Sequence, residues 1–355
     1  NEIARASRGM FPGNVVCKTA HALALGCLPA DLREKAKRGN HLSRGQLERF
    51  LNTRVALSET DAKDLAWVAK QAMHWFCISD DPYPALHHVQ RALADSYMAI
   101  EPERVMAVLP AMWEAIATAD GSLPLTFDGY LKVVQLSGMP LPFDYVLADE
   151  CQDTYPAIQS IIRNSGAQVA WVGDPNQQIY EFNGAENAMN RLQELEEYPL
   201  TLAFRFGEWL AELVQPLLYQ LGEKEVIRGN PEVETRRALR TLPVRLARGN
   251  ATLLSPLVKA IRAGKRVHVL GGAEKLHGML NSAESVMRKH RVQAGLFAGL
   301  HSWHEAREKA SERDSRALRE VVQLLDKYKL SEVRRCVEAV CPTEADAQIV
   351  LSTVH

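Results

Sequence analysis

The sequence predicts an α/β protein of two domains, each built on a parallel sheet and each interrupted by a helical insertion. The chain has 355 residues, which is enough for two domains with substantial cores. Apolar runs of strand length alternate with amphipathic helical segments, a pattern typical of parallel sheets. Two of these runs end abruptly in acidic residues, as the carboxyl ends of strands do where a sheet carries a functional site.

The composition excludes some classes of protein but does not indicate a ligand. The 42 basic and 43 acidic residues leave a net charge of −1, so charge alone does not indicate nucleic acid. The 6 cysteines show no CxxC spacing, which argues against a zinc site and for reduced thiols. No signal peptide and no apolar run of membrane-span length is present. We therefore expect a protein of a reducing compartment that is not secreted and has no membrane partner.

The most informative stretch covers residues 143–185. The run 145–148 (YVLA) is followed at once by Asp149 and Glu150, and the run 168–172 (QVAWV) by Gly173 and Asp174. A continuous apolar run of this length predicts a buried parallel strand. The two strands would be neighbours and would end at the same edge of the sheet.

Four carboxylates would gather at that edge: Asp149, Glu150, Asp153 and Asp174. Clustered carboxylates repel one another and attract a hard cation such as magnesium. Acids at strand ends also serve as helix caps, and Asp153 is a candidate for that role. A lone acidic pair would favour the capping interpretation, but the pair stands in a long and specific string.

Six strings carry a resemblance to a known family. DECQD (149–153) and VGDPNQQIYEFNGA (172–185) resemble motifs II and III of the UvrD/Rep-type superfamily 1 helicases. TAHALA (19–24), LTLAFRFG (200–207) and the final TVH resemble motifs Ib, IV and V. DGYLKVVQLS (128–137) makes the chain most similar to the F-box DNA helicases and their bacterial relatives.

The resemblance implies two RecA-like domains, 1A and 2A, with helical insertions 1B and a reduced 2B. The glycine-rich phosphate-binding loop GxxxxGK[ST] and the arginine of motif VI have no counterpart in the sequence. We therefore expect domain 1A to be incomplete at its N-terminus, and the chain to be a fragment of a helicase or an ATPase-dead relative. The expected boundaries are 1–27 with 111–206 for 1A, 28–110 for 1B, 207–273 with 343–355 for 2A, and 274–342 for 2B.

The elements are expected in the following order. A helix end at 1–8 leads to a strand at 14–18. Residues 31–50 are helical and basic, and several amphipathic helices fill 60–120, their aromatic residues in the core. A helix over 186–197 leads to a strand at 199–202, and a long helix starts at 208. Residues 222–250 read as a basic loop, followed by strands at 251–254, 266–270 and 348–355 and a helical region at 274–342.

For nucleotide chemistry, the resemblance assigns roles residue by residue. Asp149 would hold magnesium, Glu150 would orient or deprotonate the attacking water, and Gln177 would sense the γ-phosphate. Arg205 would neutralise charge in the transition state, a role worth roughly 10³–10⁵ in rate in other phosphoryl-transfer enzymes. Phe204 matches an aromatic that stacks on adenine, although a core phenylalanine is an almost equal interpretation. ATP and magnesium are thus the implied cofactors.

For DNA, the resemblance implies contacts with single strands or single-strand/duplex junctions, and helical or missing regions could take a protein partner. Thr19 could instead be a helix cap and His21 merely polar. The implied activity is ATP-dependent translocation on DNA, 3′ to 5′ in the family, in DNA repair. The alternatives are a non-catalytic DNA- or protein-binding module and a metal-dependent nuclease. The residues implied to contact DNA are Thr19, His21, Tyr180, Phe182, Thr353 and His355.

Overall fold

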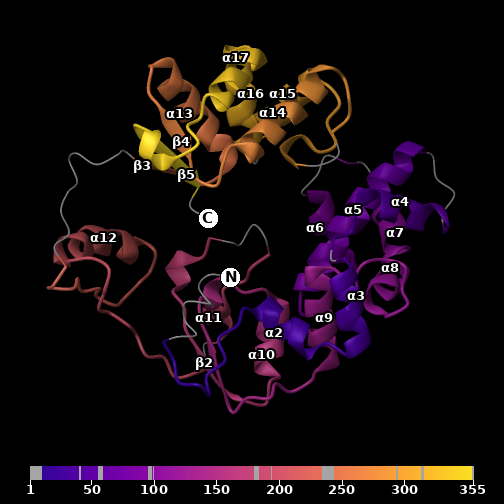
Figure 1. Cartoon of the computed structure of the whole chain (residues 1–355), viewed down its shortest axis with the longest axis vertical. Helices are drawn as coiled ribbons and strands as arrows, with labels where there is room; N and C mark the ends of the chain where they lie inside the picture. The colour runs from indigo at the N-terminus through magenta and orange to yellow at the C-terminus, as the bar shows by residue number, and fades with distance from the viewer. Residues whose placement is uncertain are drawn as a thin grey trace.

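The computed structural model describes residues 10–39, 41–54, 59–94, 98, 100–179, 184–192, 194–233, 244–292, 295–312 and 316–353. These residues form a mixed α/β protein with two small parallel sheets and many helices, consistent with the RecA-like helicase fold. One hydrophobic core gathers residues between Ala24 and Ile162, and a second gathers residues between Ala251 and Leu351. In Figure 1 the second core lies in the orange and yellow part at the top.

The first core is mostly helical. Trp67, Trp75 and Trp113 pack against it and Phe76 lies within it, as predicted. No helix among the described residues is long and apolar enough to cross a membrane. The helices are α2 (Ala20–Cys27), α3 (Ala30–Arg38), α4 (Arg44–Asn52), α5 (Glu59–Ile78), α6 (Leu86–Ala94), α7 (Pro102–Met106), α8 (Leu109–Ala117), α9 (Phe127–Ser137) and α10 (Pro156–Arg163).

Local capping explains where several of these helices begin. The single helix expected over 31–50 is two, because Ser43 and Gln46 form a reciprocal capping box that starts α4 after the turn at Gly39. Thr126 caps α9 by accepting the N–H of Gly129. The strand expected at 14–18 is absent: Val15 and Val16 are exposed and no described strand pairs with them. The helix end expected at 1–8 lies outside the described residues.

The first sheet pairs β1 (Tyr145–Ala148) with β2 (Gln168–Trp171) in parallel, as predicted. Ala148 lies opposite Trp171, so both strands end at the same edge. The expectation that β1 is buried on both faces is wrong, because Tyr145 is 69% and Leu147 72% exposed. Among the described residues only one face of this strand is covered, and Val146 packs there against the core.

Beyond β2 the chain forms short elements and then the second core. The elements are a 3-10 turn (Pro175–Gln177), α11 (Ala188–Arg191), α12 (Glu208–Gln220), β3 (Val244–Ala247), α13 (Asn250–Arg262), β4 (Val267–Val269), α14 (Glu274–Met287), α15 (Trp303–Ser311), α16 (Arg316–Lys327), α17 (Leu330–Glu338) and β5 (Ile349–Thr353). The second sheet has the order β3-β5-β4, all parallel. The strands expected near 266–270 and 348–355 and the helices in 274–342 are therefore present.

Four expectations after residue 185 are wrong in detail. Residues 251–254 belong to α13, where apolar side chains recur at helical spacing and are buried, with Pro256 inside the helix. Strand β3 lies within the stretch expected to be a basic loop. The helix expected over 186–197 is described only at Ala188–Arg191. At 199–202 a single parallel bridge from Leu202 to Arg228 stands in place of a strand.

Candidate functional site

The candidate site is built where β1 and β2 end. The ladder continues past both strands, because the N–H of Val172 donates to Ala148 O at 2.7 Å and the N–H of Cys151 donates to Val172 O at 3.0 Å. Asp149 and Glu150 follow β1 directly and are exposed. This is the edge at which open α/β sheets bind ligands.

Glu150 has a strained backbone. Its φ of 54° and ψ of 41° lie in the left-handed region, which residues other than glycine rarely adopt. Its N–H donates to Asp149 Oδ1 at 3.0 Å. Strain of this kind persists only where the surrounding contacts enforce it, and it is found most often at functional sites.

Gln152 supplies one such contact, and sequence reasoning missed it. This residue is buried, and its amide Nε2 donates to Glu150 Oε2 at 2.6 Å. Its Oε1 accepts the N–H of Asp174 at 3.2 Å. A Cβ at Gly173 would lie 2.5 Å from Gln152 Oε1, so the close approach needs a glycine there. The position of Gln152 between two predicted site acids in DECQD was the available signal.

The other two acids are engaged by donors from the segment after β2. Asp174 Oδ2 accepts from Gln177 Nε2 at 2.7 Å and its Oδ1 from the N–H of Asn176 at 2.9 Å. Asp153 Oδ1 accepts the N–H of Ile179 at 3.1 Å rather than capping the next helix. No three of these four carboxylates converge within metal-ligand distance among the described residues, so the cluster is looser than the sequence suggested.

Asp149 nevertheless suits a magnesium ion held with a nucleotide. Its carboxylate is exposed, and its only hydrogen bond to a described residue is the one that Oδ1 accepts from Glu150. Magnesium usually keeps several waters and takes one or two carboxylates plus substrate phosphates. A single free carboxylate at this edge therefore fits that ion, and a closed cage of acids is not required.

Phe204 and Arg205 lie in an exposed turn before α12. Phe204 is 77% exposed, so its interpretation as a core residue is not supported. Arg205 makes no hydrogen bond or ion pair with another described residue. Beyond α12, the chain contacts the segment after β2, where Asn176 Nδ2 donates to Glu223 Oε2 at 3.3 Å.

The residues implied to contact DNA are only partly described. Thr19 caps α2 by accepting the N–H of Ala22 at 3.2 Å, which leaves its hydroxyl proton available. Thr353 ends β5 in the second sheet. Tyr180, Phe182 and His355 lie outside the described residues.

His21 belongs to a three-residue cluster from three helices. Asp128 on α9 has Oδ2 2.8 Å from His74 Nδ1 on α5, and Oδ1 3.7 Å from His21 Nε2 on α2. Burial favours a raised pKa for Asp128, but the hydrogen bond from His74 and the nearby ring of His21 outweigh it and hold this pKa well below its usual range. The sequence singled out His21 without its two partners.

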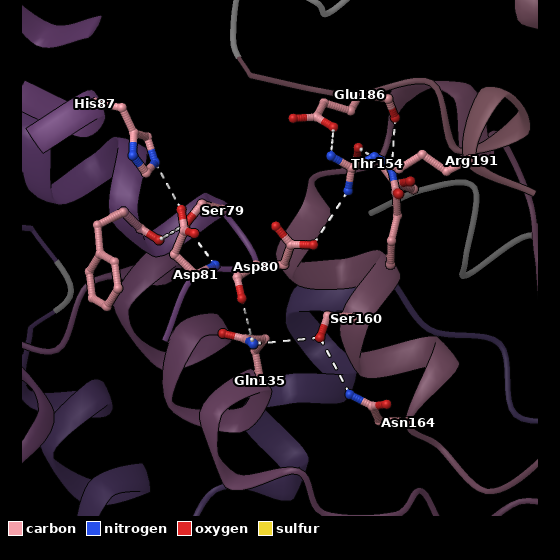
Figure 2. A network of polar contacts seen from close by, with 12 residues as sticks. Ser79, Asp80, Asp81, His87, Gln135, Thr154, Ser160, Asn164, Glu186 and Arg191 are labelled. Atoms are coloured by element: carbon pink, nitrogen blue, oxygen red, sulfur yellow. Dashed lines mark hydrogen bonds and ion pairs between the residues drawn. The ribbon is translucent and has the colours of Figure 1, made fainter. Parts of the chain in front are cut away.

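A polar network joins the turn after α5 to the residues around the site (Figure 2). Arg191 pairs with Glu186 and, at 3.4 Å, with Asp80 in the turn after α5. Gln159 Nε2 donates to the carbonyls of Thr154 and Glu186 at 3.2 and 2.8 Å, which joins the segments after motifs II and III. The turn after α5 is thus connected through Arg191 to Glu186, which Gln159 joins to the segment after motif II.

Asp81, His87 and His88 form the one group of three potential metal ligands among the described residues. His88 Nδ1 accepts the N–H of Ala85 at 2.9 Å, so the proton of the neutral ring is on Nε2, 3.0 Å from Asp81 Oδ2. Burial lowers the pKa of His88 to about 4, which keeps the ring neutral. A protonated Nε2 cannot ligate a metal. The group instead forms hydrogen bonds between α6 and the turn after α5.

Comparison with known proteins finds a family that resembles the segment containing DECQD and most of the segment after β2. Residues 134–198 match the family described as UvrD/REP helicase N-terminal domain. The chain is 26% identical over 384 aligned positions to F-box DNA helicase 1 of Gallus gallus, covering 99% of this chain and 38% of that protein. It is 31% identical over 238 positions to F-box DNA helicase protein 1 of Schizosaccharomyces pombe, covering 62% of this chain and 27% of that protein. The chain spans less than half the length of these relatives, and its similarity to UvrD-like superfamily 1 helicases of the F-box type is confirmed.

Proposed function

We propose that this chain, a relative of the UvrD-like superfamily 1 DNA helicases, is part of an ATP-dependent motor that moves along single-stranded DNA. The observation that supports this most directly is the pair Asp149 and Glu150 at the carboxyl end of β1. Glu150 is held there in the left-handed conformation beside an exposed Asp149. Such a geometry presents two carboxylates to a ligand bound at the sheet edge.

In this proposal Asp149 holds magnesium, which when bound with ATP neutralises charge on the phosphates. Glu150 orients the attacking water and accepts its proton. Gln152 donates to Oε2 only, so Oε1 remains available to a water. The hydrogen bond fixes the direction of the carboxylate, and orientation of a nucleophile accounts for much of the rate in phosphoryl transfer.

Gln177 and Arg205 complete the proposed nucleotide site. Gln177 is exposed, and its contact with Asp174 places it on the same hydrogen-bonded chain as Glu150, through Gln152. A change at the γ-phosphate sensed by Gln177 would reach Glu150 along that chain. Arg205, which has no partner among the described residues, is free to compensate transition-state charge, and Phe204 beside it is exposed enough to stack on adenine.

The remaining family-derived assignments belong to the same proposal. It includes the division into domains 1A, 1B, 2A and 2B and movement in the 3′ to 5′ direction. It also includes action at single-strand/duplex junctions in DNA repair and a nuclear or nucleoid location. The strand would pass Thr19, His21, Tyr180 and Phe182 in the first domain and Thr353 and His355 in the second. An ATPase-dead relative that only binds DNA or a protein is the competing function.

The test is DNA-stimulated ATP hydrolysis by the full-length protein carrying Glu150→Gln. Loss of a general base typically costs about 10²–10⁴ in rate, so we expect turnover to fall by that factor while nucleotide binding is retained. Asp144→Asn is the matched control, because this exposed acid precedes β1 at the opposite end of the same strand. Normal steady-state hydrolysis by Glu150→Gln would overturn the assignment.

Two results with the wild-type protein would favour the alternatives. DNA binding without any hydrolysis would indicate a binding module. Magnesium-dependent strand cleavage without ATP would indicate a nuclease that uses the same carboxylates.

A further inference from the structure

A cavity lies between α5, the start of α9 and the loop before α4, beside the cluster of His21, His74 and Asp128. Its volume is about 210 Å³. Its floor includes Cys77 and Ile116, which are buried, and Phe127 and His41 at its rim are exposed. The cavity therefore has an apolar floor beside the carboxylate of Asp128, and it is polar or aromatic where it opens.

The size of the cavity limits its occupant. Pockets that enclose drug-sized ligands have volumes of about 300–1,000 Å³. A cavity of about 210 Å³ is too small for a nucleoside triphosphate and suits one flat heteroaromatic ring. His41, His74 and Asp128, which line it, do not form a three-ligand metal group among the described residues.

Phe127 gives the opening a surface on which a ring can stack. It is 52% exposed although it is a phenylalanine at the first position of α9. His21 lies edge-on to it, with ring centroids 6.3 Å apart. Bases of single strands stack on exposed aromatic side chains with little regard for sequence.

The charges around the cavity distinguish a base from a phosphate. Asp128 lines the interior, and its carboxylate would repel a phosphate while accepting an N–H, which every base carries. Lys70 lines the wall and uses one N–H on Leu42 O at 2.9 Å, which leaves two donors. His41 at the rim makes no hydrogen bond with a described residue. A base would enter while its phosphate stays near Lys70 and His41.

We propose that this cavity binds one unstacked base of a single DNA strand and extends the strand path at Thr19 and His21 into the helical insertion. The inference rests on the proposed function, because it needs a single strand to pass α2. It assigns Phe127 as the stacking residue and Lys70 as the phosphate contact. Neither residue belongs to the motifs that resemble DNA-contacting motifs of the family.

The experiment measures the affinity of the purified chain for a fluorescent oligo-dT strand across a salt titration. Loss of one base stack corresponds to about a 5- to 150-fold weaker Kd for Phe127→Ala. Phe127→Trp should keep the affinity of the wild type, because tryptophan also offers a ring on which a base can stack. Lys70→Met should make the negative slope of log K against log salt less steep by about 0.7, the value for one phosphate of a single strand. Tyr83→Ala is the control, because Tyr83 is 76% exposed and lies outside the cavity.

The outcomes separate this inference from the proposed function. Wild-type binding that Phe127→Ala and Lys70→Met leave unchanged overturns the inference and leaves the proposed function standing. Equal losses for Phe127→Ala and Tyr83→Ala, or no rescue by Phe127→Trp, also overturn it. Absence of single-strand binding by the wild-type chain, together with absence of DNA-stimulated hydrolysis by the full-length protein, overturns both. Circular dichroism of each variant shows that the fold is retained.

Discussion

The buried amide of Gln152 donates to the carboxylate of Glu150 at 2.6 Å while the carbonyl oxygen of the same side chain accepts the N–H of Asp174 at 3.2 Å. One side chain therefore joins the end of β1 to the segment after β2. Glu150 is in the left-handed region, and this hydrogen bond is one of the contacts that keep it there. The two acidic motifs act as one unit because of this link.

Gln152→Leu should destabilise the chain and slow the full-length protein. The N–H of Asp174 loses its acceptor, and a partly buried donor left unsatisfied costs about 1–3 kcal/mol. We expect that loss in the free energy of unfolding measured with urea, together with a lower kcat for DNA-stimulated hydrolysis. Gln168→Leu, at the exposed start of β2, should change stability by less than about 0.5 kcal/mol. Equal stability of the two variants would show that Gln152 is not a structural link.

Asp128→Asn should reduce stability in a pH-dependent way. The pKa of Asp128 is depressed in the folded state by His21 and His74. Its contribution is therefore present above the unfolded pKa of about 3.9 and is lost as the pH falls toward the folded value. Hydrogen bonds to a charged group are worth about 1.5–3 kcal/mol. Urea unfolding should show a difference of that size between wild type and Asp128→Asn at pH 7, shrinking below about pH 4. A difference that is constant with pH would contradict the assignment, and Asp144→Asn serves as control.

An ion pair joins the two cores: Arg291, after α14, lies 2.6 Å from Asp64 on α5. Asp64 is buried, its Oδ1 has no hydrogen-bond partner, and burial raises its pKa although Arg291 opposes the shift. Removing one partner of a buried pair leaves an uncompensated charge and costs about 3–5 kcal/mol. Because Arg291 is partly exposed, we expect about 3 kcal/mol for Arg291→Met at pH 7.

That loss should shrink as the pH falls, since a raised pKa means that protonation of Asp64 relieves the buried charge. Adding Asp64→Asn to Arg291→Met should recover most of the stability at neutral pH. Arg288→Met is the matched control, because the side chain of Arg288 is 69% exposed and pairs with Glu284 one helical turn earlier; such pairs contribute about 0.3–0.5 kcal/mol. A double variant as unstable as Arg291→Met alone would show that the pair does not carry the effect.

The cysteines should divide into two reactivity classes. Burial raises the pKa of Cys151 to about 11 and also raises the pKa of Cys77 and Cys336. Only thiolates react, so at pH 8 Cys151 should be alkylated roughly 100-fold more slowly than an ordinary thiol. Cys17, Cys27 and Cys341 are partly exposed and should react first. Peptide mass spectrometry after iodoacetamide treatment of the native chain measures the order, and early labelling of Cys151 would show that the acidic motif opens.

The sequence alone determined the parallel pair β1 and β2, the placement of Asp149 and Glu150 at its edge, and the similarity to UvrD-like helicases, because apolar runs that end in acids and short motif strings are local signals. It misassigned residues 251–254, since four apolar residues suit a strand or a buried helix equally until the buried face of α13 is seen. Only the tertiary structure decided that Gln152 ties Glu150 to Asp174 and that Asp128 gathers His21 and His74. The contacts from Gln152 to Asp174 and from Asp128 to His21 and His74 join residues that lie far apart along the chain. Hydrogen bonds and ion pairs across such distances follow from packing, which no local pattern specifies.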